Sequence, residues 1–164
     1  DPCAGNPFGR QWFSIPRFDG STEVTAAVAM NKAAEDLNAF LDARLAEEGL
    51  GPEALVLVGF SQGAMMSLHV APRRDVPVAC VVAISGKLMR PGTLAMEMKV
   101  RMPVLLIHGD ADEVVPFGEM QAAGNALVQN DFPTYAHVMK GSGHGIAPDG
   151  LQAALGFILQ HLPK

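Results

Sequence analysis

The sequence has few of the residues that mark specialised classes of protein. Its 164 residues include only two cysteines, Cys3 and Cys80, so it does not encode a disulfide framework. No apolar run approaches the roughly 18 residues of a membrane-spanning helix, so we predict no stable membrane insertion. Charged residues make up 18% of the chain, the net charge is -5, and no basic stripe is present. This composition gives no electrostatic reason to bind nucleic acid, and we expect a cytoplasmic location.

The composition that remains is that of a globular protein. Hydrophobic residues account for 49% of the chain, which is far from the polar, highly charged composition of disordered proteins. A chain of 164 residues can form one domain with its own core but is short for two ordinary domains. We therefore predict a single domain over residues 1–164.

Apolar runs without alternation predict strands that are covered on both faces, as in parallel sheets. Strands are predicted at residues 54–60, 78–85, 104–108 and 134–139. Helices are predicted at 61–70, 117–129 and 151–162, with a glycine-rich loop at 141–150. This alternation predicts the α/β class, with a mainly parallel sheet flanked by helices.

The first part of the chain is predicted to contain a short extended piece at residues 12–15 and then a long helix. Asp19, Ser21 and Thr22 are candidate caps for this helix, which ends at Gly49. Three- and four-residue spacing predicts its apolar face. That face comprises Val24, Val28, Asn31, Ala34, Leu37, Leu41 and Leu45.

The segment GFSQG, residues 59–63, has the pattern G-x-S-x-G between a predicted strand and a predicted helix. A sharp turn there would hold Ser61 in a strained backbone conformation at its tip. We expect glycine at positions 59 and 63 because side chains would collide where the strand and helix cross. The helix N-terminus favours developing negative charge, so the backbone N–H of Gln62 is a candidate oxyanion donor.

A serine hydroxyl needs a base to accept its proton, and in this kind of site the acid and the base follow the serine in chain order. The segment HGDADEVVP follows the strand at 104–108 and contains Asp110 and Asp112. Both would lie at the carboxyl end of the sheet, where α/β proteins bind ligands. Spacing alone does not choose between them, since one could cap the turn while the other orients the base.

His144 is the candidate base, in the segment KGSGHGIAP after the last predicted strand. We expect it to be exposed in its loop, and it alone among the histidines combines the right chain order with that position. An alternative interpretation makes His108, Asp110, Asp112 and Glu113 metal ligands. No second histidine cluster or cysteine pair supports it, so we predict no metal and no other cofactor.

Together, GFSQG, HGDADEVVP and GSGHGI resemble the phospholipase/carboxylesterase family of α/β-hydrolases, which includes the acyl-protein thioesterases. The segment QWFSI, residues 11–15, also resembles a tryptophan-containing stretch of that family. The resemblance implies an α/β-hydrolase fold and a small-molecule ester or thioester substrate. It implies Ser61 as nucleophile, His144 as base, Asp112 as acid and the backbone of Gln62 in the oxyanion hole, with Asp110 as a turn residue.

The sequence departs from this family upstream of Ser61. No glycine-rich HGxG-like loop is present to supply a second oxyanion donor, and the family's first strands, on the order of 60 residues, are not recognisable. We therefore expect an N-terminally truncated α/β-hydrolase fold. The strand at 54–60 would then leave an apolar edge open, which a second copy in a homo-oligomer or a separate fragment would have to cover.

The predicted reaction is hydrolysis of carboxylic esters through a Ser-Asp-His acyl-enzyme mechanism. Acyl-protein thioesterase, lysophospholipase and lactone-opening activities would use the same residues, and a non-catalytic binding protein on this fold is a further alternative. Trp12 and Phe13 are candidates for lining the acyl pocket, with core packing the expected role of at least one of them.

Overall fold

The computed structural model describes residues 2–3 and 6–163, and the chain divides into two compact units, Asp1–Arg44 and Leu45–Lys164. The second unit contains Ser61, Asp112 and His144. The assignment of one domain to residues 1–164 stays a prediction.

The first unit contains a small antiparallel hairpin of β1 (Pro2–Cys3) and β2 (Asn6–Arg10), followed by the short helix α1 (Pro16–Asp19). The predicted extended piece at 12–15 is confirmed only in part, since Ile15 has extended backbone but residues 12 and 13 form a bend. Phe13 is buried without pairing in a sheet, so its apolar character reflects packing rather than strand formation.

The long helix α2 (Glu23–Glu48) confirms the predicted helix, and Thr22 caps it by accepting a hydrogen bond from the Thr25 N–H at 3.1 Å. The predicted apolar face is wrong in the first half of the helix, where Val24 and Val28 are exposed. The buried residues are Ala26, Met30, Ala33 and Leu41. Two of the buried residues are alanines. The prediction followed the spacing of the larger apolar residues and therefore placed the buried face on the wrong side of this part of the helix.

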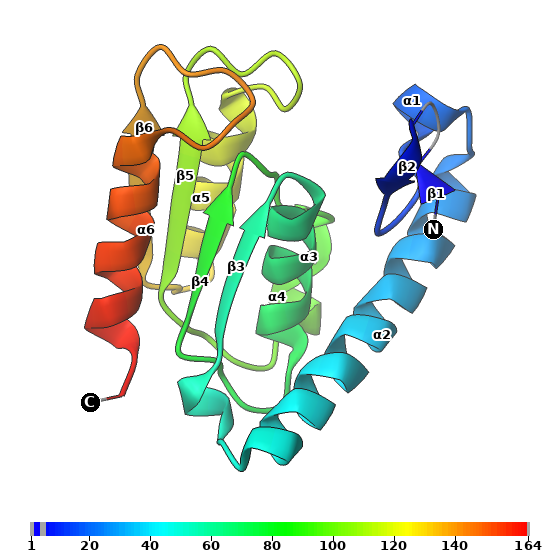
Figure 1. Cartoon of the computed structure of the whole chain (residues 1–164). Helices are drawn as coiled ribbons and strands as arrows, with labels where there is room; N and C mark the ends of the chain where they lie inside the picture. Colours follow the sequence, from blue (N-terminus) through cyan, green and yellow to red (C-terminus); the bar gives the residue numbers. More distant parts are fainter. Residues whose placement is uncertain (1, 4–5, 164) are drawn as a thin grey trace. The chain divides into compact units, whose positions relative to one another are not determined.

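The second unit is built on four parallel strands in the order β3-β4-β5-β6 (Figure 1). They are β3 (Val56–Phe60), β4 (Cys80–Ile84), β5 (Val104–Gly109) and β6 (Thr134–Met139). All residues of β4 and β5 are buried, which explains why these strands appear in the sequence as continuous apolar runs. The predicted parallel sheet is therefore confirmed. The expectation that the strand at 54–60 is covered on both faces is wrong, because Val58 and Phe60 of β3 are exposed.

Helices cover both faces of this sheet (Figure 1). On one face lies α6 (Pro148–His161), whose Ala154 and Phe157 join Val82, Ile107 and Met139 in the buried core. The opposite face is covered by α3 (Gln62–Val70) and α5 (Gly118–Gln129).

The remaining helical segments are short. They are η1 (Pro52–Ala54), η2 (Ala71–Arg73), η3 (Pro91–Thr93) and α4 (Leu94–Glu97). Among residues 2–3 and 6–163, no helix has both the length and the apolarity needed to cross a membrane.

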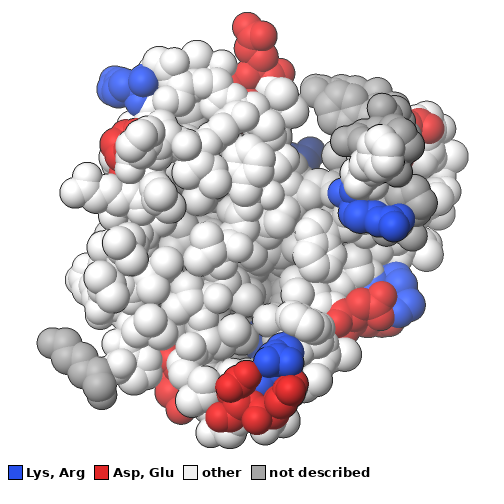
Figure 2. Space-filling view, in the orientation of Figure 1, with Lys and Arg blue, Asp and Glu red and all other residues white. Residues whose placement is uncertain are grey.

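The α6 side of the sheet carries exposed apolar residues and little charge. Within the described residues β3 is an end strand, as expected, and its Val58 and Phe60 are exposed on the face that α6 partly covers. Leu151, Leu155 and Leu159 form an exposed stripe along α6. Figure 2 shows few Lys, Arg, Asp or Glu over this part of the second unit.

Candidate active site

The turn between β3 and α3 holds Ser61 in an uncommon backbone conformation, with φ 53° and ψ -117°. Its N–H donates to the carbonyl of Ile84 at 2.9 Å, which anchors the turn to β4. A Cβ on Gly59 would collide with the backbone of Gly63, so glycine is required at position 59. At Gly63 a Cβ would meet nothing within 4 Å, so the expectation that crowding requires both glycines is wrong for the second one.

Asp112, in the loop after β5, has a fully buried carboxylate that accepts hydrogen bonds on both oxygens. Oδ1 accepts the N–H groups of Val114 and Val115, each at 2.9 Å, and Oδ2 lies 2.8 Å from His144 Nδ1. Burial raises the pKa of Asp112, but the hydrogen bonds from His144 and from these two N–H groups outweigh burial and bring the pKa below its usual 3.8. Asp112 is therefore ionised at neutral pH.

His144 lies between Asp112 and Ser61, with its Nε2 3.0 Å from Ser61 Oγ. An ionised carboxylate only accepts hydrogen bonds, so Nδ1 carries the proton and Nε2 is left to accept from the serine hydroxyl. The ring also contacts Phe60, with 4.9 Å between centroids. These neighbours leave only 18% of the His144 side chain exposed, so the expectation of an exposed histidine is wrong.

Asp110 holds the loop that carries His144. Its Oδ1 accepts the Gly141 N–H at 2.6 Å, and the neighbouring Ala111 N–H donates to the Ser142 carbonyl at 3.0 Å. A Cβ on Gly109 would collide with the same loop at Ser142. The two aspartates therefore have different contacts: Asp112 meets the imidazole, and Asp110 joins the loops after β5 and β6.

Comparison with known proteins agrees with this fold. The model of the phospholipase/carboxylesterase family matches residues 3–162 of the chain. The chain belongs to the phospholipase/carboxylesterase family. It is therefore a hydrolase of the α/β-hydrolase fold, in a family whose members include proteins named esterases, carboxylesterases and acyl-protein thioesterases.

This family member is similar to proteins that are longer than itself. It is 29% identical to the esterase YpfH of Escherichia coli (strain K12), covering 98% of this chain and 67% of that protein. It is 28% identical to acyl-protein thioesterase 1 of Saccharomyces cerevisiae, covering 92% of this chain and 68% of that protein. The crystal structure of esterase PE8 matches with a TM-score of 0.89 and 40% identity, over 98% of this chain and 74% of that one.

Gln62 is the first residue of α3, so its backbone N–H lies at the positive end of the helix dipole directly after Ser61. Trp12 and Phe13 belong to the first unit, where Trp12 is partly exposed and Phe13 is buried. Their role in lining an acyl pocket stays a prediction.

The other histidines of this family member differ in their surroundings. His137 Nε2 contacts Asp149 Oδ2 at 2.8 Å, and His161 Nδ1 contacts the Phe157 carbonyl at 2.8 Å. His69 is buried within α3.

The sequence suggested His108 only as a possible metal ligand, and its place beside the site was missed. Its Nε2 lies 3.4 Å from Asp112 Oδ2. The only signal was the four-residue spacing between them. Within residues 2–3 and 6–163, no group of three or more His, Cys, Asp or Glu could hold a metal ion.

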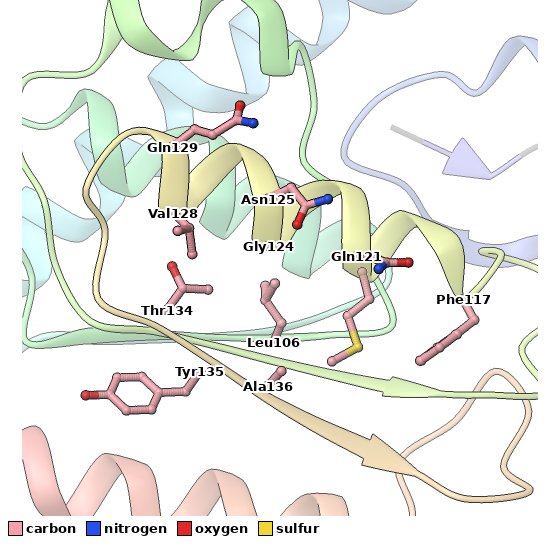
Figure 3. Close-up of a pocket in the computed structure, with 11 residues that line it drawn as sticks. Leu106, Phe117, Gln121, Gly124, Asn125, Val128, Gln129, Thr134, Tyr135 and Ala136 are labelled. Carbon is pink, nitrogen blue, oxygen red and sulfur yellow. The ribbon is translucent and has the colours of Figure 1, made fainter.

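A cavity of about 650 Å³ lies between α5 and the strands β5 and β6 (Figure 3). Apolar groups such as Leu106 and Phe117 and uncharged polar groups such as Gln121 and Asn125 line it. Ser61, Asp112 and His144 do not line this cavity, so its size and lining give no information about the acyl group that would reach the serine.

Proposed function

We propose that this family member hydrolyses carboxylic esters through an acyl-enzyme on Ser61, with His144 as general base and Asp112 as its partner. The observation that carries the proposal is a continuous pair of hydrogen bonds. His144 Nδ1 donates to Asp112 Oδ2 at 2.8 Å, and Ser61 Oγ donates to His144 Nε2 at 3.0 Å. These distances suit proton transfer without a further movement of the side chains.

The reaction proceeds in two steps. Ser61 Oγ attacks the ester carbonyl while His144 Nε2 takes the hydroxyl proton, and the ionised Asp112 stabilises the positive imidazolium. His144 then gives that proton to the leaving alcohol. Water then attacks the acyl-enzyme while His144 Nε2 takes a proton from it. The bond between the acyl carbon and Ser61 Oγ breaks, His144 returns the proton to Oγ, and the carboxylic acid is released.

The oxyanion of each tetrahedral intermediate would accept a hydrogen bond from the backbone N–H of Gln62 at the start of α3. The sequence upstream of Ser61 contains no HGxG-like loop of the kind expected to supply a second donor. If the second donor is lacking, we expect turnover lower by about 10²–10³-fold than with both donors present.

Labelling of the 164-residue chain with a fluorophosphonate, read by intact mass, tests the proposal. We expect one adduct on Ser61, because the phosphonate reacts only with a serine that a base has activated. Ser61→Ala should lose the adduct and lower the rate of p-nitrophenyl butyrate hydrolysis by ~10⁴-fold or more. Ser67→Ala is the matched control, since its hydroxyl bonds the Gly63 carbonyl within the same helix. An unlabelled chain would favour a binding protein on this fold, and an active Ser61→Ala variant would refute the assignment.

Thioester hydrolysis is the second candidate, favoured by the similarity to acyl-protein thioesterase 1 of Saccharomyces cerevisiae. The same three side chains would serve, because the acyl-enzyme is common to both reactions. A series of p-nitrophenyl esters of increasing chain length, compared with an S-palmitoylated peptide, separates the two. Lysophospholipids and lactones extend the same series. Homo-oligomer formation and a cytoplasmic location stay predictions from the sequence.

A further inference from the structure

His108 lies beside Asp112 near the carboxyl end of β5, with 1% of its surface exposed. Its Nε2 lies 2.9 Å from the Val115 carbonyl oxygen and 3.4 Å from Asp112 Oδ2. A carbonyl oxygen only accepts hydrogen bonds, so Nε2 must carry a hydrogen. The same N–H therefore lies close to the carboxylate oxygen that binds His144.

His108, Val115 and Asp112 each contact the other two. The Val115 carbonyl accepts from His108, while the Val115 N–H donates to Asp112 Oδ1 at 2.9 Å. Phe117 packs edge-on against the His108 ring, with 6.1 Å between centroids and 75° between planes. The imidazole is thus held on one side by an aromatic ring and on the other by the segment that holds the carboxylate.

We propose that His108 is a positioning residue for Asp112. It holds the turn at Val115 and favours the orientation in which Oδ2 of the carboxylate points at His144 Nδ1. If His108 lacked its Nε2–H, the turn at Val115 would no longer support the Asp112 carboxylate. The carboxylate would also lose one favourable partner for its negative charge. The inference rests on the proposed function, because it supposes that Asp112 orients His144 during turnover.

Two substitutions separate the hydrogen bond from the bulk of the side chain. His108→Leu removes the N–H and should lower kcat for p-nitrophenyl butyrate by about 10- to 100-fold, with KM changed less than about twofold, because the loss affects orientation rather than binding. His108→Gln places an amide N–H at a similar reach and should restore most of kcat. If the Leu variant does not fold, as judged by circular dichroism, His108→Asn replaces it, since its shorter amide does not reach the Val115 carbonyl.

A double-mutant cycle with Asp112→Ala tests whether His108 acts through Asp112. Asp112→Ala alone should lower kcat by ~10⁴-fold. Adding His108→Leu should then change kcat by less than about twofold, because no carboxylate remains to be oriented. His69→Leu is the control: this histidine is also buried but lies outside the site, so it should change kcat by the same factor with or without Asp112.

The outcomes distinguish this inference from the proposed function. If Asp112→Ala keeps its activity, or if the parent chain neither labels nor turns over, the proposed function fails and this inference fails with it. If Asp112→Ala is inactive as expected, three results would overturn the role of His108 alone. These are an unchanged kcat in His108→Leu, a His108→Gln variant as slow as the Leu variant, and a double mutant in which the two losses multiply.

Discussion

Acid should weaken this protein well above the pH at which its carboxylates become protonated, because of His69. This side chain in α3 is 4% exposed, and its Nδ1 has no hydrogen-bond partner among the described residues. Burial, with a smaller contribution from the positive charges of Arg73 and Arg90, lowers the pKa of His69 from its usual 6.5 to about 4. Glu97 opposes this effect only in part, since it is itself paired with both arginines.

The sign follows from which state binds the proton more readily. In the unfolded chain His69 is protonated as pH falls below 6.5, whereas in the folded protein it stays neutral down to pH 4. Stability from this residue is therefore complete above pH 6.5 and is lost progressively as pH falls toward 4. The two pKa values differ by about 2.5, and each pKa unit is equivalent to about 1.4 kcal/mol, so the full loss approaches about 3 kcal/mol.

Most of this loss of stability occurs at pH values where the protonation of carboxylates changes the free energy of unfolding little. At pH 5 the free energy of unfolding should already be lower by about 2 kcal/mol than at pH 7, against a total of about 5–15 kcal/mol for an ordinary domain. The carboxylates whose pKa is lowered, such as Asp112 and Asp149, lose their contribution only as pH falls below the ordinary pKa of 3.8. The interval from pH 7 to 5 therefore separates the contribution of His69 from that of these carboxylates.

Urea unfolding followed by circular dichroism at pH 7, 6 and 5 measures the effect. His69→Leu keeps a side chain of similar bulk but has no proton to gain, so its free energy of unfolding should fall by less than about 0.5 kcal/mol over this interval. Ser67→Ala, which changes a non-titrating polar side chain in the same helix, should keep the pH dependence of the parent protein. An equal fall in stability in the parent and in His69→Leu would refute the reasoning.

Three further predictions follow from packing. Gly109→Ala should push the loop at Ser142, which carries the candidate base, and lower kcat by ~10²-fold, as measured with p-nitrophenyl butyrate. Gly59→Ala should destabilise the protein by about 3 kcal/mol, whereas Gly63→Ala, which meets no neighbour, should be neutral in the same urea titration. Burial raises the pKa of the Cys80 thiol to about 11, so Cys80 should react with a thiol reagent at pH 8 only after denaturation, and rapid reaction of the native protein would contradict this.

The sequence by itself determined the parallel sheet and its helices. The strands β4 and β5 lie between two layers of helices and are buried throughout. Their residues are therefore apolar up to His108 near the end of β5, and the apolar runs can be recognised from the sequence alone. The G-x-S-x-G pattern located the turn at Ser61 because the crossing of β3 and α3 restricts the residue at Gly59 locally. The turn depends on contacts between residues close together in the chain, and the strands are recognised from their own apolar composition.

Only the tertiary structure decided which side chains meet at the carboxyl edge of the sheet. His144 is 32 residues from Asp112 and 83 from Ser61, and the pairing of β5 with both β4 and β6 brings them within hydrogen-bond reach. The residues alone left Asp110 and Asp112 as alternatives, and gave His108 no role other than that of a possible metal ligand. The physical reason is that two residues apart in a loop can point to different neighbours, and the positions of those neighbours are set by distant segments of the chain.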